Sequence, residues 1–430
     1  MTDPTGRFRL ARMAYNVLIH ALVPLAVLHF LWRSRREPGY RRHLGERIGL
    51  GSAPGGGRDL WVHAVSLGEM RVAGILLRAL TAGRPDLRVL LTTVTPAGRA
   101  EAERIRAGVP VDIRYLPLDS PWALRPFIRR WQPRVLILIE TELWPNLLWE
   151  AHAAGLSTVL VNARLSPRLR ATYRRFAALY TPLLARLEWV AAQSPDDARH
   201  LRELGAQRVE VTGNLKFDLP TPPPPALTRD RFSGHQLWVA GSTHPGEEPV
   251  LLDVHRRLQA ASRGTRVQLL IAPRHPARAP ELLALAAAAG FTTILRSALR
   301  DGPTTADVVV LDTLGELAAL YALGDAAFVG GSLVDHGGQN PLEPIAAGCP
   351  VVIGPDSRNF GDMVRQLRAF GAILQVSDPD TLFEALHRLL GDGRTRQALV
   401  ERARETMRQN GGATGHTLRL LGALLPAAGR

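Results

Sequence analysis

The sequence contains a single cysteine, Cys349, in 430 residues, so no disulfide can form within the chain. Aromatic residues make up only 6% of the chain, too few for the stacked platforms of a single-stranded nucleic-acid groove. The thirteen histidines are scattered and lack the paired spacing of zinc ligands. We therefore expect no disulfide framework, no zinc site and no nucleic-acid partner, and we expect Cys349 to be a buried structural thiol.

Apolar and basic residues, in contrast, are plentiful. Hydrophobic residues account for 46% of the chain and charged residues for 21%, which is typical of a globular protein. The length of the chain predicts two domains. The 53 basic against 39 acidic side chains give a net charge of +14, and most of the basic residues are arginine. This charge favours an anionic partner, such as an anionic membrane surface or a phosphorylated substrate.

Residues 14–32 form an apolar run about as long as a membrane-spanning helix requires. Four residues weaken it, namely Asn16, His20, Pro24 and His29. No small-residue cleavage site comes after it, so a signal peptide fits poorly, and the arginines after the run favour the cytoplasmic side for the next domain. We expect residues 1–50 to be a membrane anchor with a basic flank, either spanning the bilayer or lying in its surface. The alternative is a helix packed on the protein's own core.

Short apolar strands alternate with helical patterns along most of the chain. Such alternation predicts βαβ units and a parallel sheet, and therefore an α/β fold. In the first half the predicted strands are residues 59–65, 88–93, 135–139, 158–161, 189–192 and 209–212, with a helix at 69–82. In the second half the predicted strands are 237–240, 267–272, 308–311, 326–329 and 351–353, and the predicted helices are 247–259, 280–289, 316–323, 359–370, 379–390 and 395–408.

A proline-rich segment separates the two halves. Residues 219–227 include four consecutive prolines, which neither a helix nor a central strand accommodates. We expect a semi-rigid linker at 219–235, between a Rossmann-like domain at 51–218 and a second one at 236–430. Ligands of such sheets bind at the carboxyl ends of the strands, so we expect the site in the cleft between the domains.

Two acidic motifs come after predicted strands of the first domain. Glu69 stands in the first turn of a helix after the strand at 59–65, where a carboxylate can act as general base on a sugar hydroxyl. Glu140 and Glu142 come directly after the strand at 135–139 and are close to Asn146. The alternative for Glu69 is an acid that complements the helix dipole. The alternative for the second motif is helix capping around Pro145.

Two basic residues are candidates for binding an anion. Lys216 lies at the exit of the last predicted strand of the first domain, and Arg274 comes after Pro273 at the end of the strand at 267–272. The planar guanidinium of Arg274 suits a phosphate, because it makes paired charge-assisted hydrogen bonds. The alternatives are an exposed linker lysine and a solvated surface arginine.

Two turns of the second domain precede predicted helices. Residues 312–317 are most simply interpreted as a helix cap. Glycines at 330–331 and 337–338 come before a helix expected to open at Asn340 and Pro341, and such a start attracts a phosphate. Glu343 in its first turn is placed to accept from ribose hydroxyls. No Walker motif and no dinucleotide fingerprint is present, so ATPase and dehydrogenase activities lose support.

These motifs together resemble the Kdo transferases of Gram-negative bacteria, which transfer 3-deoxy-D-manno-octulosonic acid (Kdo) at the start of the lipopolysaccharide core. The ordered set covers nearly the whole chain. Its segments are PGYRRHLGERIG (38–49), HAVSLGE (63–69), TTVTPAG (92–98), YLPLD (115–119), ETELWPN (140–146), LVNARLS (160–166), AQSPDDA (192–198), GNLKFD (213–218), APRHP (272–276), DTLGEL (312–317) and GGSLVDHGGQNPLEP (330–344). Leu67, Leu314 and Gln339 stand where relatives often have other residues.

The resemblance implies roles for particular residues. It implies the GT-B fold, with the acceptor on the first domain and CMP on the second. Glu69 matches the family's proton acceptor, and Glu140 and Lys216 match positions of transition-state stabilisation. The CMP-binding segments match Pro273 and Arg274, then Leu314, Gly315 and Glu316, and finally Asn340, Pro341, Leu342 and Glu343.

The resemblance also implies the reaction and its location. The donor is expected to be CMP-Kdo, the acceptor a lipid A precursor (lipid IVA), and the displacement inverting. No cofactor or metal is expected, because oriented hydrogen-bond donors take over charge stabilisation. The enzyme is expected at the inner (cytoplasmic) membrane, against its anionic surface, with the catalytic domains on the cytoplasmic side. Two alternatives stay open: a GT-B enzyme that uses a UDP-sugar, and a non-enzymatic adaptor of membranes or nucleic acid.

Overall fold

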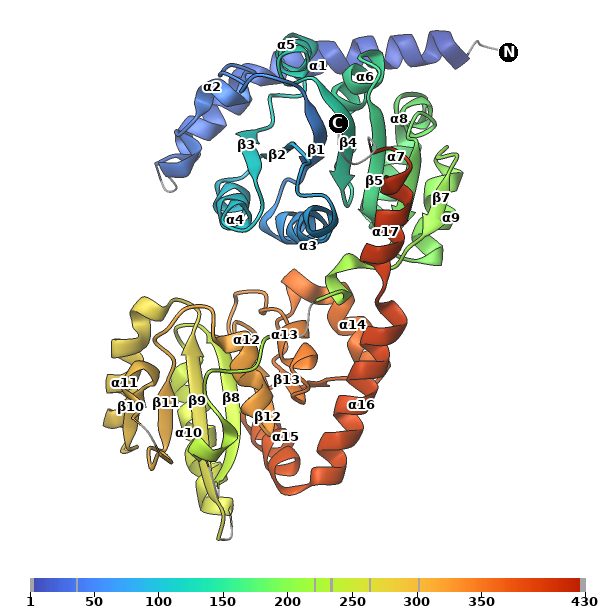
Figure 1. The fold of residues 1–430 in the computed structure, drawn as a ribbon. Coiled ribbons are helices and arrows are strands. Elements are labelled where there is room, and N and C mark those ends of the chain that lie inside the picture. The colour runs from blue at the N-terminus through green and yellow to red at the C-terminus, as the bar shows by residue number, and fades with distance from the viewer. Residues whose placement is uncertain are drawn as a thin grey trace. The chain divides into compact units, whose positions relative to one another are not determined.

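The computed structural model describes residues 4–35, 38–219, 222–232, 235–262, 264–300 and 302–425. The chain forms two compact units, which are considered separately (Figure 1). Unit 1 comprises Met1–Asp218 together with Asn410–Arg430, and unit 2 comprises Leu219–Gln409. Each unit is built around a parallel sheet, in agreement with the α/β fold that the alternating sequence pattern predicts.

The described part of unit 1 contains one sheet of seven parallel strands in the order β3-β2-β1-β4-β5-β6-β7. The strands are β1 (Arg58–His63), β2 (Val89–Thr93), β3 (Val111–Tyr115), β4 (Pro133–Ile139), β5 (Ser157–Ala163), β6 (Trp189–Ala192) and β7 (Val209–Val211). The central strands are nearly continuous apolar runs because both faces of the sheet are covered. β3 is absent from the predicted strands, because Asp112 and Arg114 alternate with its apolar residues and hide the short pattern.

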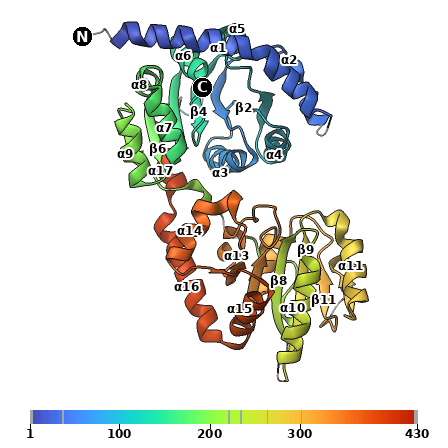
Figure 2. The same cartoon turned by 180° about the vertical axis from the view of Figure 1, so that it is seen from behind.

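Helices cover both faces of this sheet. They are α1 (Pro4–Arg33), α2 (Leu44–Arg47), α3 (Leu67–Gly83), α4 (Pro96–Arg106), α5 (Pro121–Trp131), α6 (Pro145–Ala153), α7 (Pro167–Arg175), α8 (Ala177–Leu184), α9 (Pro195–Glu203) and α17 (Ala413–Gly422). Leu60 and Val62 point into one core with α3 and α4, whereas Trp61 between them points into the other core with α5 and α6. This is the alternation that a strand imposes on its side chains. Figure 1 shows the two helical layers, and Figure 2 shows them from behind.

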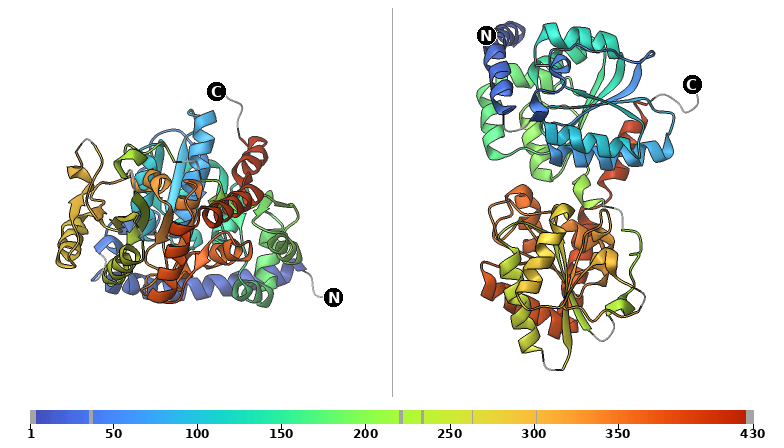
Figure 3. Two further views of the ribbon diagram at one scale, coloured as in Figure 1. Left: turned by 90° about the horizontal axis from the view of Figure 1, so that it is seen from below. Right: turned by 90° about the vertical axis from the view of Figure 1, so that its left-hand side faces the viewer.

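The helix α1 differs from the predicted anchor. It runs lengthwise along unit 1 (Figure 3), buries Phe8 in the core of this unit, as the alternative interpretation expects, and also contacts the unit through polar side chains. Tyr15 Oη donates to Asp119 at 2.7 Å, and Arg12 pairs with Glu150 at 3.3 Å. Among the described residues, no helix is both long and apolar enough to cross a bilayer. A membrane-spanning anchor is therefore not supported, and the polar groups that interrupt the apolar run explain why.

Unit 2 has the same kind of sheet. In its described part the strand order is β10-β11-β9-β8-β12-β13-β14, all parallel. The strands are β8 (His235–Thr243), β9 (Arg266–Pro273), β10 (Thr293–Leu295), β11 (Val308–Val310), β12 (Ala326–Val329), β13 (Val351–Ile353) and β14 (Leu374–Gln375). The helices are α10 (Glu248–Ala261), α11 (Ala279–Ala288), α12 (Leu317–Leu320), α13 (Leu342–Ala346), α14 (Gly361–Ala369), α15 (Pro379–Gly391) and α16 (Gly393–Asn410). α10 and α15 pack side by side on one face (Figure 2), and Cys349 is buried, as predicted.

Part of the predicted linker at 219–235 is packed rather than extended. Leu227 and Phe232 are almost completely buried in the core of unit 2, and β8 already begins at His235. The proline run carries no apolar periodicity, so the sequence pattern hides these two anchoring side chains.

The predicted second domain at 236–430 requires a correction at its end. Residues 410–430 belong to unit 1, because α17 packs on α3 and buries Ala413 and Leu421 in the core of unit 1. The carboxylate of Asp218, where the chain leaves unit 1, accepts the backbone N–H groups of Gly412 and Thr414 at the start of α17. This contact joins two points that are almost two hundred residues apart, and a local sequence pattern does not encode it.

We predict that Leu421→Ala lowers the free energy of unfolding by about 2–4 kcal/mol, because it removes a fully buried side chain and leaves a cavity. Urea denaturation monitored by tryptophan fluorescence measures the loss. Leu285→Ala, at a residue of α11 that is 37% exposed, is the control and should cost much less. Equal losses for the two variants would contradict the packing of α17 on unit 1.

Candidate functional site

In unit 1 the strand order reverses between β1 and β4, since the chain builds β2 and β3 on one side of β1 and later strands on the other. Ligands of open parallel sheets bind at the carboxyl ends of the strands at such a reversal. Glu69 comes after β1 and Glu140 directly after β4. The fold therefore brings the two predicted acidic residues to the same point of the sheet.

Glu69 is held in one orientation by the start of α3. Ser66 caps the helix, its Oγ accepting from the Glu69 N–H at 3.2 Å and donating to Glu69 Oε1 at 2.6 Å. The N–H of Val65 donates to Glu69 Oε2 at 2.7 Å. Glu69 thus lies in the first turn of α3, where its alternative interpretation places an acid that complements the helix dipole. It is also only 9% exposed, and burial raises its pKa, with the nearby charge of Glu140 acting in the same direction, whereas hydrogen bonds that its carboxyl group accepts from Ser66 and Val65 oppose the rise.

Glu140 and Lys216 form an ion pair. Lys216 Nζ lies 2.7 Å from Glu140 Oε1, with both side chains less than a third exposed. Glu140 has a φ of +62°, a left-handed conformation that is uncommon for a residue with a side chain and that concentrates at functional sites. Lys216 sits in the 3-10 helix η2 (Leu215–Phe217), whose first N–H donates to Asn162 Oδ1 at 3.0 Å.

Glu142, the second glutamate of the predicted acidic motif, completes this group of carboxylates, although the family resemblance gives it no role. Burial and the charges of Glu69 and Glu140 raise the pKa of Glu142 to about 7, against a hydrogen bond of 2.7 Å from Trp144 Nε1. Three glutamates thus share one neighbourhood with a single lysine. The sequence signal is the pair of glutamates at a strand end, but spacing alone does not show which of the two contacts Lys216.

In unit 2 the strand order reverses between β8 and β12. The predicted nucleotide-binding residues come after the strands β11, β9 and β12, so they lie along one edge of the sheet. Pro273 ends β9, and the N–H of Arg274 donates to the Thr243 carbonyl of β8 at 2.9 Å. Gly315 adopts a φ of +83° in the turn after β11, next to Leu314, which is 84% exposed. Glu316 pairs with Arg296 at 2.8 Å.

The helix predicted to open at Asn340 and Pro341 begins slightly later in the chain. α13 begins at Leu342 and extends over only five residues, with Pro341 as its cap residue. Asn340 Oδ1 accepts the Leu342 N–H at 3.1 Å, and Asn340 Nδ2 donates to Glu343 Oε1 at 3.3 Å. Asn340 thus accepts the first N–H group of this short helix, and the binding of a phosphate at the helix start stays a prediction.

Glu247, which lies outside the sequence motifs, holds two loops together at this edge of the sheet. Glu247 is completely buried, and it accepts backbone N–H groups of His244, Gly331, Ser332 and Leu333 at 2.7–2.9 Å. Burial raises the pKa of Glu247, while these four hydrogen bonds lower it. Glu247 fixes the turn after β8 to the glycine-rich loop after β12. A glutamate one residue before a helix carries no local sign of such long-range contacts.

Two family models match the chain. One, described as 3-deoxy-D-manno-octulosonic-acid transferase (kdotransferase), matches residues 42–219, and one described as glycosyl transferases group 1 matches residues 304–406. The 3-deoxy-D-manno-octulosonic acid transferase of Haemophilus influenzae is 36% identical over 95% of this chain and 98% of its own. The protein of the same name from Bordetella pertussis is 38% identical over 95% and 98%. The chain belongs to the Kdo transferase family.

As a member of the Kdo transferase family, the chain is a glycosyltransferase. Its fold also resembles the glycotransferase of kitacinnamycin, with a TM-score of 0.51, 17% identity and coverage of 86% of this chain and 100% of the other. This likeness supports the GT-B fold that the resemblance implies. Within the described residues, no group of three or more histidine, cysteine, aspartate and glutamate side chains has the arrangement of a metal site.

Lys216 is also the one lysine of the sequence, since the 53 basic residues are one lysine and fifty-two arginines. A compact ammonium and a planar guanidinium are not equivalent when a single carboxylate oxygen must be contacted. All of the remaining Lys and Arg positions of the chain hold arginine. The choice of lysine at position 216 alone is therefore a sign of a functional residue that can be found in the sequence.

We predict that Glu142→Gln stabilises unit 1 at alkaline pH. A carboxyl whose pKa rises on folding, here from 4.5 to about 7, contributes most to stability below its unfolded pKa, and this contribution is lost as the pH rises through the folded pKa. The neutral glutamine avoids the loss, so at pH 8 the free energy of unfolding of the variant should exceed that of the wild type by about 1–3 kcal/mol. Below pH 5 the difference should vanish.

Urea denaturation at pH 5 and at pH 8 measures this difference. Glu203→Gln, at an exposed position at the end of α9, is the control. An equal increase in the free energy of unfolding at both pH values would contradict a raised pKa of Glu142.

Proposed function

We propose that this glycosyltransferase moves Kdo from CMP-Kdo to the lipid A precursor lipid IVA, in lipopolysaccharide core biosynthesis. Membership of the Kdo transferase family supports the donor sugar. The main support for the proposed chemistry is the environment of Glu69. This carboxylate is buried at the strand reversal of unit 1, has a raised pKa and is held by hydrogen bonds from Val65 and Ser66. Its basicity suits proton abstraction from a hydroxyl near neutral pH.

The proposed step is a direct displacement. An acceptor hydroxyl attacks the anomeric carbon of Kdo as Glu69 removes its proton, and the bond from that carbon to the CMP phosphate breaks. Attack from the face opposite CMP inverts the anomeric configuration. The transition state resembles an oxocarbenium ion, and the ion pair of Glu140 and Lys216 stabilises its charges. Glu142, whose pKa is raised to about 7, is protonated in about half of the molecules at that pH, which reduces the negative charge beside Glu69 and Glu140.

Unit 2 is proposed to bind CMP. Arg274, fixed to β8 through its backbone, binds the phosphate, and Pro273, the turn Leu314–Glu316 and the segment Asn340–Glu343 surround the nucleoside. A cationic side chain takes the place that a metal ion has in other glycosyltransferases, so we expect no metal requirement. The phosphates of the acceptor are assigned to the arginine-rich helix α7 and to the basic residues that flank α1.

An in vitro assay tests this function. CMP-Kdo is formed enzymatically in a separate reaction and then combined with purified protein, lipid IVA and an excess of EDTA, and mass spectrometry detects the product. We expect a mass gain of at least one Kdo in the presence of EDTA. Glu69→Gln should lower the rate by about 10²–10⁴-fold, because it removes the general base, and CMP should still raise the melting temperature of the variant. Glu203→Gln is the matched control.

Two results would contradict the proposal. A wild-type protein that CMP does not stabilise but UDP does would favour a UDP-sugar donor. A Glu69→Gln variant that loses CMP stabilisation together with activity would assign a structural role to Glu69.

We also propose that α1 lies in the surface of the inner membrane, with the catalytic units on its cytoplasmic side. α1 buries Phe8 in unit 1 and contacts it through Arg12 and Tyr15, yet many of its large apolar side chains stay exposed. The exposed residues are Leu10, Met13, Val17, Leu18, Leu22, Leu25, Leu28 and Trp32. A helix with such an apolar face and flanking arginines is typical of interfacial binding.

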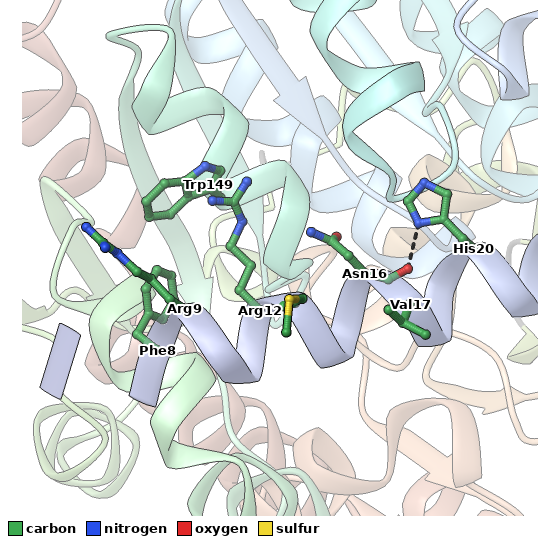
Figure 4. A pocket seen from close by; sticks show the side chains of 8 residues that line it. Phe8, Arg9, Arg12, Asn16, Val17, His20 and Trp149 are labelled. Carbon is green, nitrogen blue, oxygen red and sulfur yellow. Dashed lines mark hydrogen bonds between the residues drawn. The ribbon is translucent and has the colours of Figure 1, made fainter. Parts of the chain in front are cut away.

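A pocket of about 750 Å³ opens beside this helix (Figure 4). Arg12 stacks on Trp149 of α6 with its guanidinium 4.0 Å from the ring centroid, and Arg9, Met13 and Val17 line the same pocket. The pocket thus combines apolar walls with two guanidinium groups. This combination suits the membrane interface, where acyl chains meet phosphate headgroups.

We predict that Val17→Glu together with Leu25→Glu weakens binding to vesicles of anionic phospholipid at least about tenfold, because two exposed apolar contacts become charges in the interface. Co-sedimentation with the vesicles measures binding. Leu285→Glu, at an exposed leucine of unit 2, should bind like the wild type. Equal binding of all three proteins would rule out α1 as the membrane contact.

A further inference from the structure

Two histidines lie at the strand reversal of unit 2. His244 comes directly after β8, and His336 belongs to the loop after β12, the neighbouring strand. Their rings stack with centroids 4.1 Å apart and planes inclined by 23°. Gln339 Nε2 lies 3.1 Å from His244 Nε2, so an amide and an imidazole are joined at the same place. The proposed transfer reaction assigns no role to these three residues.

The two rings are carried by rigid backbone. Glu247 binds the N–H of His244 and the N–H groups of Gly331, Ser332 and Leu333, so one carboxylate positions both sides of the pair. Gly331 has a φ of +68°, and a Cβ there would lie 3.2 Å from His244 Cδ2. The glycine therefore lets the loop approach the imidazole closely. Such support is typical of a group that must be held in place before its ligand arrives.

The surroundings of the pair are strongly cationic. Burial lowers the pKa of His244 to about 4, and the neighbouring His336, Arg274, His275 and Arg278 act in the same direction. The acidic groups on the adjacent elements have other partners. Glu247 binds backbone N–H groups, Glu248 and Glu281 pair with Arg278, and Asp335 and Asp356 pair with Arg358. Within the described residues, neither histidine ring forms an ion pair with a carboxylate. The surroundings of His244 and His336 therefore favour the binding of an anionic group of a ligand.

The donor of the proposed reaction carries two anionic groups. The anomeric carbon of Kdo bears a carboxylate besides the phosphate ester, so the two anions are separated by only a few bonds. Arg274 is assigned to the phosphate, and it is close enough to His244 for its charge to lower the pKa of that imidazole. A second group that donates hydrogen bonds beside Arg274 is therefore required for the carboxylate.

We propose that His244 and His336, with Gln339 beside them, bind the carboxylate of the donor sugar. This inference rests on the proposed function. The two histidines would thus select nucleotide-linked 2-keto sugar acids over nucleotides linked to neutral sugars. The carboxylate gains charge-assisted hydrogen bonds that a neutral sugar does not form. Binding of the carboxylate next to His244 stabilises the protonated imidazole and thus draws a proton into the site.

The test compares donor use with CMP binding in His336→Gln and in His244→Asn. His336 is exposed, so its variant is expected to fold, and the CMP-induced shift in melting temperature checks the fold of both variants. We expect the KM for CMP-Kdo to rise roughly 10- to 100-fold, while the affinity for CMP changes less than about threefold. His387→Gln removes another stacked ring, on Phe383 of α15, and should match the wild type.

The pH dependence gives a second readout. The pKa of His244 is depressed in the empty site and raised by a bound carboxylate, so affinity for the donor should increase as the pH falls from 8 to 6. This slope should become shallower in His244→Asn, in which His336 is still present. An equal loss of CMP affinity and donor affinity, or an unchanged KM for the donor, would overturn the proposal although transfer itself persists. Absence of transfer by the wild-type protein would overturn both this inference and the proposed function.

Discussion

The reversal of strand order in a parallel sheet is the constraint on which both sites depend. β1 and β4 are neighbours in the sheet of unit 1, and β8 and β12 are neighbours in the sheet of unit 2. In each pair, the strands that follow one member are added on one side of the sheet and those that follow the other member on the opposite side. Side chains that come after these strands converge without any nearness in the sequence. Glu69 and Glu140 meet in this way in unit 1, and His244 and His336 meet in unit 2. The same geometry thus gathers acids in one unit and bases in the other.

Three glutamates of the chain lie in different environments, and the environment decides the role that each carboxylate can take. Glu247 is surrounded by four backbone N–H groups and fixes two loops. Glu140 has a lysine partner, which keeps its charge balanced. Glu69 has fewer compensating donors and an acidic neighbour, so its affinity for a proton increases. Only the last of these combines a fixed position with the basicity that proton transfer needs.

The sequence predicts the larger features of this structure because they depend on local patterns. Alternating strands and helices indicate the α/β fold, and the ordered motifs indicate the family. Contacts between distant segments remain outside such patterns. The pairing of Lys216 with Glu140 joins residues 76 positions apart, and Glu247 reaches a loop more than eighty positions away. The composition of the apolar run near the start of the chain indicates an anchor, whereas its contacts with Asp119 and Glu150 decide which side faces outward.

The return of α17 to unit 1 has a consequence for the order in which the protein is made. Unit 2 is one continuous stretch of chain, but the core of unit 1 lacks Leu421 and its neighbours until the ribosome has synthesised everything from 219 to 409. At ordinary rates of translation this takes about 10–40 s. During that interval the face of α3 that α17 later covers stays accessible, so the nascent chain presents an apolar surface to chaperones for far longer than the folding of a single continuous domain requires.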